Sequence, residues 1–274
     1  MSAPAPHDNF TLKEEIRAYW SARAESFDRS FGHAIKSDRE LKAFQRLIGD
    51  SFGPEPLDVL DLACGTGEIT RALLSLKHRV TALDFSEAML ERARAKHGKA
   101  ARFRLGDAEH LLDEDASYDA AITRHLVWTL PDPAAAFADW FRVLKPGGRL
   151  LIVDADTALR SRKARLLQRI ATVLKRFGKA VESPGVDPQV HNRIVSQVHF
   201  SGGAQAEAIA ALLTAAGFTA VTIDRDHGKI RRAQARHMPL HQCLSRAAQD
   251  RYAISAAKPF DTEKTDAQPG HRAA

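Results

Sequence analysis

The chain has 274 residues, of which 44% are hydrophobic and 27% are charged, so it is long enough for one large α/β domain with additions or for two small domains. Its two cysteines, Cys64 and Cys243, are too few for a disulfide framework and lie in no cluster typical of zinc ligands. The net charge of +6 mildly favours anionic partners. No apolar run approaches the ~20 residues that span a bilayer, so we expect a cytoplasmic protein. We expect no resident metal.

The first 52 residues are predicted to form a helical lead-in. Residues 1 to about 10 are expected to be disordered, and apolar residues at helical spacing predict helices at 12–27 and 38–48. The first helix carries Tyr19, Trp20 and Arg23, which either pack in the core or form a lid over a ligand. The breaker run GPEP at 53–56 then begins a new unit.

From residue 57 a pattern of strand, turn and helix repeats, which is typical of a parallel sheet built from βαβ units. We predict strands at 57–62, 79–83, 101–105, 118–123 and 149–154. Ser86 is the expected N-cap of the helix after the second strand, and Asp132 with Pro133 predicts the start of a helix that ends at Val143.

The rhythm breaks after residue 156. The segment 159–179 combines apolar residues at helical spacing with eight basic residues and no acidic one. Such a helix can contact a membrane, nucleic acid or an anionic substrate, but a helix packed by its apolar face, with the basic face in solvent, is the favoured interpretation. Further along we predict a loop at 183–203, a helix at 205–216, strands at 220–224 and near 241–245, and a disordered tail from 247.

A glycine-rich turn follows the first strand, in the sequence LDVLDLACGTG at 57–67. Glycine has no Cβ, so Gly65 and Gly67 can adopt positive φ and let a ligand approach the backbone. The helix that begins near Glu68 would direct free N–H groups at the same place. The turn therefore predicts a ligand site.

Polar residues also end the neighbouring strands. Asp61, Asp84 and Asp107 end the first, second and third strands, and residues 123–125 end the fourth. Carboxyl ends of parallel strands meet at one edge of the sheet, where a carboxylate at Asp84 suits two ribose hydroxyls and one at Asp107 suits an adenine amine. Together these ends predict a nucleoside-binding site.

The residue after the turn, Glu68, suggests which nucleoside ligand binds. A dinucleotide site needs glycines that open onto a pyrophosphate, whereas here DLACGTGE places Glu68 where that pyrophosphate would lie. Since a carboxylate repels phosphates, a ligand with a positively charged amino-acid portion fits better.

On these residues the chain resembles the class I S-adenosylmethionine-dependent methyltransferases, particularly the branch that methylates small molecules and quinones. The motifs are VLDLACGTG at 59–67, ALDFSEAML at 82–90, GDAEHL at 106–111 and the strand that precedes LKPGG. The similarity is close over about 57–156 and loose over 205–225. It implies an α/β Rossmann-like fold, with a seven-stranded, mostly parallel sheet, helices on both faces and a helical cap.

The resemblance also implies roles for individual residues. Asp61 would lie near the amino group of S-adenosylmethionine, Asp84 would bind its ribose, and Tyr19, Trp20, Arg23 and Trp128 would lie beside the acceptor. The residues expected to contact the cofactor are Asp61, Ala63, Gly65, Gly67, Asp84, Phe85, Gly106, Asp107, Ala108 and Arg124.

A general base is needed only where the acceptor must lose a proton, because the sulfonium methyl is already activated. His125 is the first candidate, since histidine titrates near neutral pH and this one ends the fourth strand. His191, His199 and His227 are weaker candidates, and each is more often a structural or surface histidine.

We therefore predict an N-terminal helical lid at 1–52, a cofactor-binding core at 53–156, a cap insertion at 157–204, the rest of the core at 205–246 and a disordered tail at 247–274. The expected activity is methyl transfer to an N, O, S or C atom of a small molecule, by a monomer or homodimer that does not insert into a membrane. The alternatives are an RNA or protein methyltransferase that docks through the basic insertion, and a non-catalytic cofactor-binding protein.

Overall fold

The computed structural model describes residues 6–158, 160–177 and 187–260. The strands are β1 (Asp58–Leu62), β2 (Arg79–Asp84), β3 (Arg102–Leu105), β4 (Tyr118–Arg124), β5 (Leu144–Asp156), β6 (Thr219–Asp224) and β7 (Asp250–Ala257). The helices are α1 (Pro6–Arg23), α2 (Asp38–Phe52), α3 (Glu68–Ser75), α4 (Glu87–His97), α5 (Pro133–Val143), α6 (Arg162–Phe177), α7 (Pro188–Gln197), α8 (Ala206–Ala215), α9 (Gly228–Ala235) and α10 (Leu240–Ala247).

The seven strands of this described part form one sheet in the order β3-β2-β1-β4-β5-β7-β6. Strands β1 to β5 pair in parallel, and β7 runs antiparallel to both of its neighbours, β5 and β6. The predicted seven-stranded, mostly parallel sheet is therefore confirmed. Because β1 lies between β2 and β4, the polar residues that end these three strands open onto the same edge.

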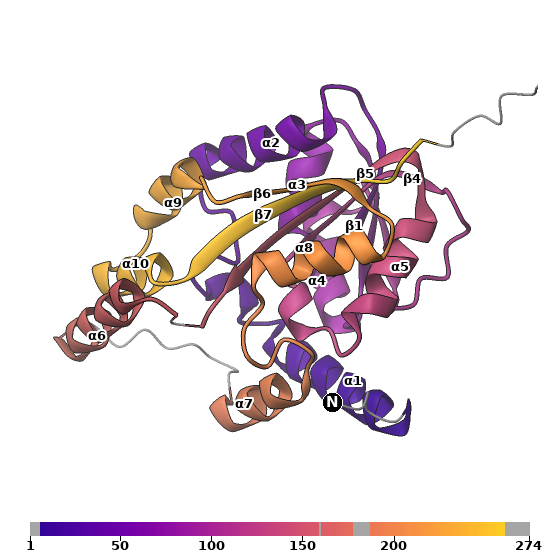
Figure 1. The fold of residues 1–274 in the computed structure, drawn as a ribbon. Helices are drawn as coiled ribbons and strands as arrows, with labels where there is room; N and C mark the ends of the chain where they lie inside the picture. The colour runs from indigo at the N-terminus through magenta and orange to yellow at the C-terminus, as the bar shows by residue number, and fades with distance from the viewer. Residues whose placement is uncertain (1–5, 159, 178–186, 261–274) are drawn as a thin grey trace, which may run out of the picture.

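Helices cover both faces of the sheet (Figure 1). On one face Trp140 of α5 and Leu213 of α8 are buried in a first apolar cluster. On the other face Ile48 of α2, Leu73 of α3 and Ile230 of α9 belong to a second cluster. Burial on both faces explains why the central strands are rich in consecutive apolar residues.

Two helix starts predicted from the sequence are confirmed by their caps. The Ser86 hydroxyl accepts a hydrogen bond from the Met89 backbone N–H at 3.3 Å, at the start of α4. The Asp132 carboxylate accepts one from Ala135 N–H at 3.0 Å, with Pro133 in the first turn of α5. Both caps bind N–H groups that have no partner within their own helix.

The segment after residue 247 differs most from the prediction. A disordered tail is wrong for Asp250–Ala257, because these residues form β7 inside the sheet (Figure 1). A strand near 241–245 is also wrong, because Leu240–Ala247 form α10. The run DRYAISAA contains little β-propensity of its own, and its extended conformation depends on hydrogen bonds to a strand on each side.

Two further segments are more helical than expected. Disorder up to residue 10 is wrong from Pro6, where α1 begins, while residues 1–5 lie outside the described residues. The predicted loop at 183–203 is wrong over Pro188–Gln197, which form α7; residues 183–186 lie outside the described residues. Asp187 caps α7 by accepting from Gln189 N–H at 2.8 Å. Ile194 of α7 packs in an apolar cluster with Ile16 of α1, so the two helices form a cap together.

Helix α6 packs in an unexpected way. Its buried residues are Ala164 and Ala171, and it packs against α10. Leu166, Val173 and Phe177 instead face solvent, with exposed fractions of 57%, 53% and 85%, whereas Leu167 and Leu174 are half-buried on the side of the two alanines. The favoured interpretation, packing through the predicted apolar face, is therefore wrong for most of that face. Across the described chain, no helix is both long and apolar enough to cross a membrane.

Replacing Ile254 with alanine tests the position of β7. Ile254 is fully buried in the first apolar cluster, so we expect Ile254→Ala to lower the free energy of unfolding by about 2–5 kcal/mol in urea denaturation. Ser255→Ala, at the half-buried neighbouring position, is the control and should change it much less. Equal stability of Ile254→Ala and the wild type would contradict a buried β7.

Candidate active site

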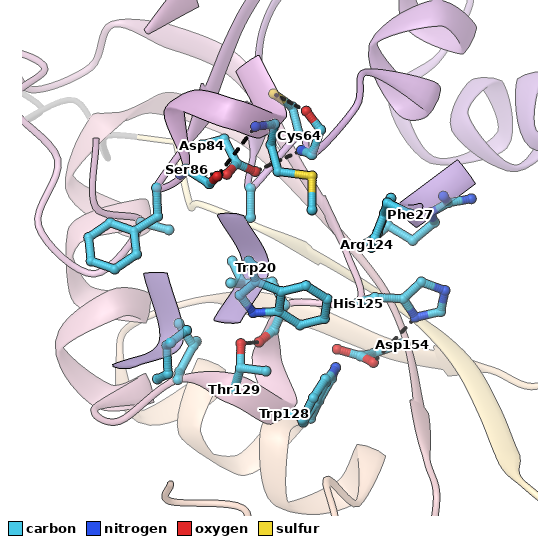
Figure 2. A pocket seen from close by; sticks show the side chains of 18 of the residues that line it. Trp20, Phe27, Cys64, Asp84, Ser86, Arg124, His125, Trp128, Thr129 and Asp154 are labelled. Atoms are coloured by element: carbon cyan, nitrogen blue, oxygen red, sulfur yellow. Dashed lines mark hydrogen bonds and ion pairs between the residues drawn. The ribbon is translucent and has the colours of Figure 1, made fainter. Parts of the chain in front are cut away.

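A cavity of about 340 Å³ opens at the carboxyl ends of the central strands. Its floor comes from the ends of β1, β2, β4 and β5, and its walls include residues of α1, α7 and α10. Figure 2 shows Asp84 and Ser86 at one end and Trp128, His125 and Asp154 at the other. This is the edge of an open parallel sheet at which ligands generally bind.

Asp61 ends β1 as a buried carboxyl group, only 1% exposed. The Thr70 hydroxyl donates a hydrogen bond of 2.6 Å to Asp61 Oδ2. Burial raises the pKa of Asp61 to about 7, although the hydrogen bond from Thr70 opposes the shift. The carboxylate is thus incompletely compensated by the protein, and a cationic group in the cavity would stabilise it.

Asp84 is held by the backbone of two turns. Asp84 Oδ2 accepts from Gly65 N–H at 2.7 Å, and Oδ1 accepts from Ser86 N–H at 2.9 Å. Burial again raises the pKa, here to about 6, against the effect of these hydrogen bonds. Gly65 has a φ of +56°, and a Cβ there would lie 3.7 Å from the ring of Phe27, so the glycine turn leaves open space on the cavity side.

Lys13 of α1 bridges the carboxylates after β3. Its ammonium lies 2.6 Å from both Asp107 and Glu109. Asp107, Glu109 and His110 are close enough to hold a metal ion, but the Lys13 ammonium already provides positive charge to the two carboxylates. The same loop is fixed from α5, because Trp140 Nε1 donates to Ala108 O at 2.7 Å.

The end of β4 places Arg124 and His125 beside the end of β5. His125 has a φ of +63°, unusual for a residue with a Cβ, and its Nδ1 lies 3.7 Å from Asp154 Oδ1. Burial and the nearby guanidinium groups hold the pKa of His125 well below its usual value. Burial raises the pKa of Asp154 to about 7. His125 is therefore neutral near pH 7.

The N-terminal helix forms an aromatic wall of the cavity. The Trp20 ring lies edge-on to Trp128, with 6.2 Å between ring centroids, and to Phe27, with 6.0 Å. The hydroxyls of Ser21 and Ser86 are hydrogen-bonded at 2.8 Å, which ties this wall to the end of β2. Tyr19 is buried, as the core-packing interpretation predicts, whereas Trp20 lines the cavity; a lid over a ligand stays a prediction.

Most residues predicted for the site line this one cavity. They are Trp20, Arg23, Asp61, Ala63, Gly65, Asp84, Phe85, Gly106, Asp107, Ala108, Arg124, His125 and Trp128. Tyr19 and Gly67 do not: the Tyr19 hydroxyl hydrogen-bonds His191 Nδ1 at 3.2 Å, and the Gly67 carbonyl lies 2.8 Å from His97 Nε2. Among the weaker candidates, His191 lines the cavity, whereas His199 and His227 do not.

The side chain of Glu68 lies elsewhere than the sequence predicts. The sequence predicts its carboxylate where a pyrophosphate would lie, but Glu68 Oε2 accepts from Ile35 N–H at 2.8 Å and Oε1 lies 2.7 Å from Lys96 Nζ. The side chain does not line the cavity. Repulsion by Glu68 therefore does not select the ligand, and the acidic residues that line the cavity are Asp61, Asp84, Asp107, Glu109 and Asp154.

Several cavity residues escaped prediction. Asp154 ends β5 as Asp61 and Asp84 end their strands, so the same rule would have found it. Arg246 and Arg251 also line the cavity but come from α10 and β7, the segments mistaken for a short strand and a tail. His33 lies in the connection before α2, where the sequence carries no signal.

Comparison with known proteins places residues 60–152 in a methyltransferase domain family. The chain is 33% identical over 142 residues to malonyl-[acyl-carrier protein] O-methyltransferase of Hahella chejuensis, covering 51% of this chain and 49% of that protein. It is 31% identical over 154 residues to demethylmenaquinone methyltransferase of Staphylococcus aureus, covering 54% and 64%. The chain thus spans about half to two-thirds of the length of these relatives.

Solved structures share the fold at low sequence identity. Phosphoethanolamine N-methyltransferase 2 of Haemonchus contortus, in complex with S-adenosyl-L-methionine, has a TM-score of 0.57 at 17% identity, covering 87% of this chain and 57% of that one. Geranyl diphosphate C-methyltransferase of Streptomyces coelicolor A3(2) has a TM-score of 0.58 at 14% identity, covering 94% and 100%.

The pH dependence of the melting temperature of Asp61→Asn tests the burial of the Asp61 carboxyl group. The pKa of Asp61 is raised from 3.8 to about 7, so the folded protein holds a proton that the unfolded chain releases, and stability falls as pH rises between these values. We expect the melting temperature of the variant minus that of the wild type to increase by several degrees from about pH 5 to about pH 8. Parallel pH profiles for the two proteins would contradict the burial of a titrating Asp61.

Proposed function

We propose that this chain, whose residues 60–152 belong to the methyltransferase domain family, is an S-adenosylmethionine-dependent methyltransferase that acts on a small molecule. The observation that carries the proposal is the single cavity that gathers Asp61, Asp84 and Asp107 from the ends of three strands beside an open glycine turn. The relative named as a demethylmenaquinone methyltransferase supports a small-molecule acceptor. A cytoplasmic location and a monomeric or homodimeric state stay predictions.

Several residues that line the cavity suit individual parts of S-adenosylmethionine. Asp61 keeps a carboxyl group in the cavity with an incompletely compensated charge, which suits the cofactor amino group. Asp84 would bind the ribose hydroxyls, and Gly65 leaves room for close approach to the backbone. Asp107 and Ala108 would contact the adenine. Phe85, Ala63 and Gly106 complete the lining of this end.

The chemistry makes limited demands on the protein. When bound, the cofactor supplies a methyl group that is already activated on a sulfonium sulfur. The chain must align the acceptor and exclude water, and the aromatic wall of Trp20, Phe27 and Trp128 does both beside the cofactor end. Arg124 lies between the cofactor end and the acceptor end of the cavity.

His125 is the proposed general base for acceptors that must lose a proton. Its lowered pKa keeps the imidazole unprotonated near neutral pH, and Asp154, 3.7 Å from Nδ1, would stabilise the imidazolium formed when a proton is taken. For acceptors with a free lone pair this transfer is unnecessary, and His125 would then only shape the cavity.

Binding of S-adenosylhomocysteine tests the cofactor assignment. By isothermal titration calorimetry we expect the wild type to bind and Asp84→Ala to bind roughly 10- to 100-fold more weakly, since charge-assisted hydrogen bonds are lost. Asp58→Ala, a carboxylate at the opposite end of β1, is the matched control and should bind as the wild type does. Absence of binding by the wild type would refute the proposal.

A screen of cell metabolites with methyl-labelled cofactor tests the activity. We expect one or more small molecules to gain the label, and His125→Gln to lower the turnover of acidic N–H or O–H acceptors by about 10²- to 10⁴-fold, with S-adenosylhomocysteine affinity unchanged. Labelling of RNA or protein instead, through the exposed basic helix α6, would favour the macromolecular alternative; cofactor binding without labelling would favour the non-catalytic one.

A further inference from the structure

The end of the cavity away from Asp84 gathers guanidinium groups from elements far apart in the sequence. Arg23 comes from α1, Arg124 from β4, Arg246 from α10 and Arg251 from β7, and all four line the cavity. Four positive groups around one cavity repel each other, so nearby negative charge stabilises their gathering.

The protein itself does not supply that charge by ion pairing. Among the described residues, none of the four arginines forms an ion pair with a carboxylate; the contacts that hold Arg246 and Arg251 are neutral. Arg246 donates to Gln234 Oε1 at 3.1 Å and to Phe31 O at 3.3 Å, and Arg251 donates to Gln249 Oε1 at 3.3 Å.

Two guanidinium nitrogens have no partner at all within the described structure. Arg124 Nη1 and Arg23 Nε are buried without a hydrogen bond. A buried donor without an acceptor is costly, so the protein leaves the guanidinium groups of Arg23 and Arg124 incompletely satisfied. The Nδ1 atom of His33, which also lines the cavity, is buried and unpartnered as well.

The electrostatic environment agrees with this geometry. Burial, together with nearby Arg246, lowers the pKa of Arg251 to about 9; burial, with Arg124, lowers that of Arg246 to about 10, although Glu40 opposes this shift. Asp154 faces the same end, but its oxygens accept from Val127 N–H and Ala155 N–H, at 3.0 and 2.8 Å, and burial raises its pKa to about 7. Asp154 is therefore only partly ionised near pH 7 and offsets only part of the positive charge of the arginines.

The walls of this end are flat and apolar. Trp20 and Trp128 meet edge to face, and the His191 ring lies 5.7 Å from Trp128 between centroids. Figure 2 shows the two indole rings beside His125 and Asp154. An acceptor here would meet aromatic surfaces on its body and guanidinium groups on its polar end.

Resting on the proposed methyl-transfer function, we propose that the acceptor is a small molecule with a flat apolar body and an anionic group, a carboxylate or a phosphate, bound by Arg246 and Arg251. Arg124 lies closer to Asp61, so it would contact either the methionine end of the cofactor or the same anionic group of the acceptor. Paired guanidinium groups bind carboxylate and phosphate through charge-assisted hydrogen bonds, which are stronger than neutral ones. Arg246 and Arg251 are thus specificity-determining residues.

Binding of simple aromatic probes tests the proposal. The full chain, saturated with S-adenosylhomocysteine and in parallel without it, is titrated with benzoate, phenyl phosphate and benzamide by ligand-observed NMR. We expect at least one anion to bind roughly tenfold or more tightly than neutral benzamide, and the stronger of the two anions distinguishes carboxylate from phosphate recognition.

Variants then locate the site. Arg246→Gln and Arg251→Gln should each weaken anion binding by roughly 10- to 100-fold and leave benzamide binding unchanged, while Arg251→Lys should recover part of the loss because it retains the charge. Arg92→Gln, which removes the same charge from the exposed side of α4, should bind as the wild type does. Affinity for S-adenosylhomocysteine within about threefold of the wild type shows that each variant is folded.

Equal binding of benzamide and both anions, or undiminished anion binding by both glutamine variants, would overturn the anion site. Loss of S-adenosylhomocysteine affinity in Arg246→Gln and Arg251→Gln, but not in Arg92→Gln, would overturn it too, because these arginines would then bind the cofactor carboxylate. Failure of the wild type to bind S-adenosylhomocysteine refutes methyl transfer instead, and the titration without it still decides whether the anion site exists.

Discussion

Burial of aspartates at the carboxyl ends of β1, β2 and β5 is the constraint on which the site depends. The parallel pairing of β1 with β2 and β4 brings Asp61 and Asp84 to the same edge, and the pairing of β4 with β5 brings Asp154 beside His125. Backbone N–H groups and the Thr70 hydroxyl hold these carboxyl groups in place. Hydrogen bonds of this kind do not fully offset desolvation, so a cationic ligand group near these carboxyl groups would be stabilising.

Charge divides the cavity into two ends. Asp61 and Asp84 make one end acidic, whereas Arg246 and Arg251 make the other cationic, and Arg124 lies between them. Such a field would orient a ligand with a positive amino-acid portion at the first end and an anionic molecule at the second. The two ligands would then meet near the aromatic wall, where water is excluded and electrostatic interactions are stronger.

The N-terminal helix couples both ends. Lys13 bridges the carboxylates after β3, Ser21 hydrogen-bonds Ser86 after β2, and Trp20 contacts Trp128 at the acceptor end. Helix α7 packs on the same helix through Ile194. Helix α1 therefore contacts both ends of the cavity, so a change in its position would alter both ends together.

The sequence alone determined the fold class, the first five strands, the caps at Ser86 and Asp132, and most of the cofactor end of the cavity, because these depend on local periodicity and on the rule that parallel strands share one edge. Tertiary structure alone decided that Asp250–Ala257 form a strand, since that segment has little propensity and is extended only by its two neighbours. It also decided that Glu68 turns away toward Ile35 and Lys96. The sequence predicted Arg23 and Arg124 for the site, but Arg246 and Arg251 depended on tertiary structure, because only the packing of α10 and β7 around the cavity brings them beside the other two.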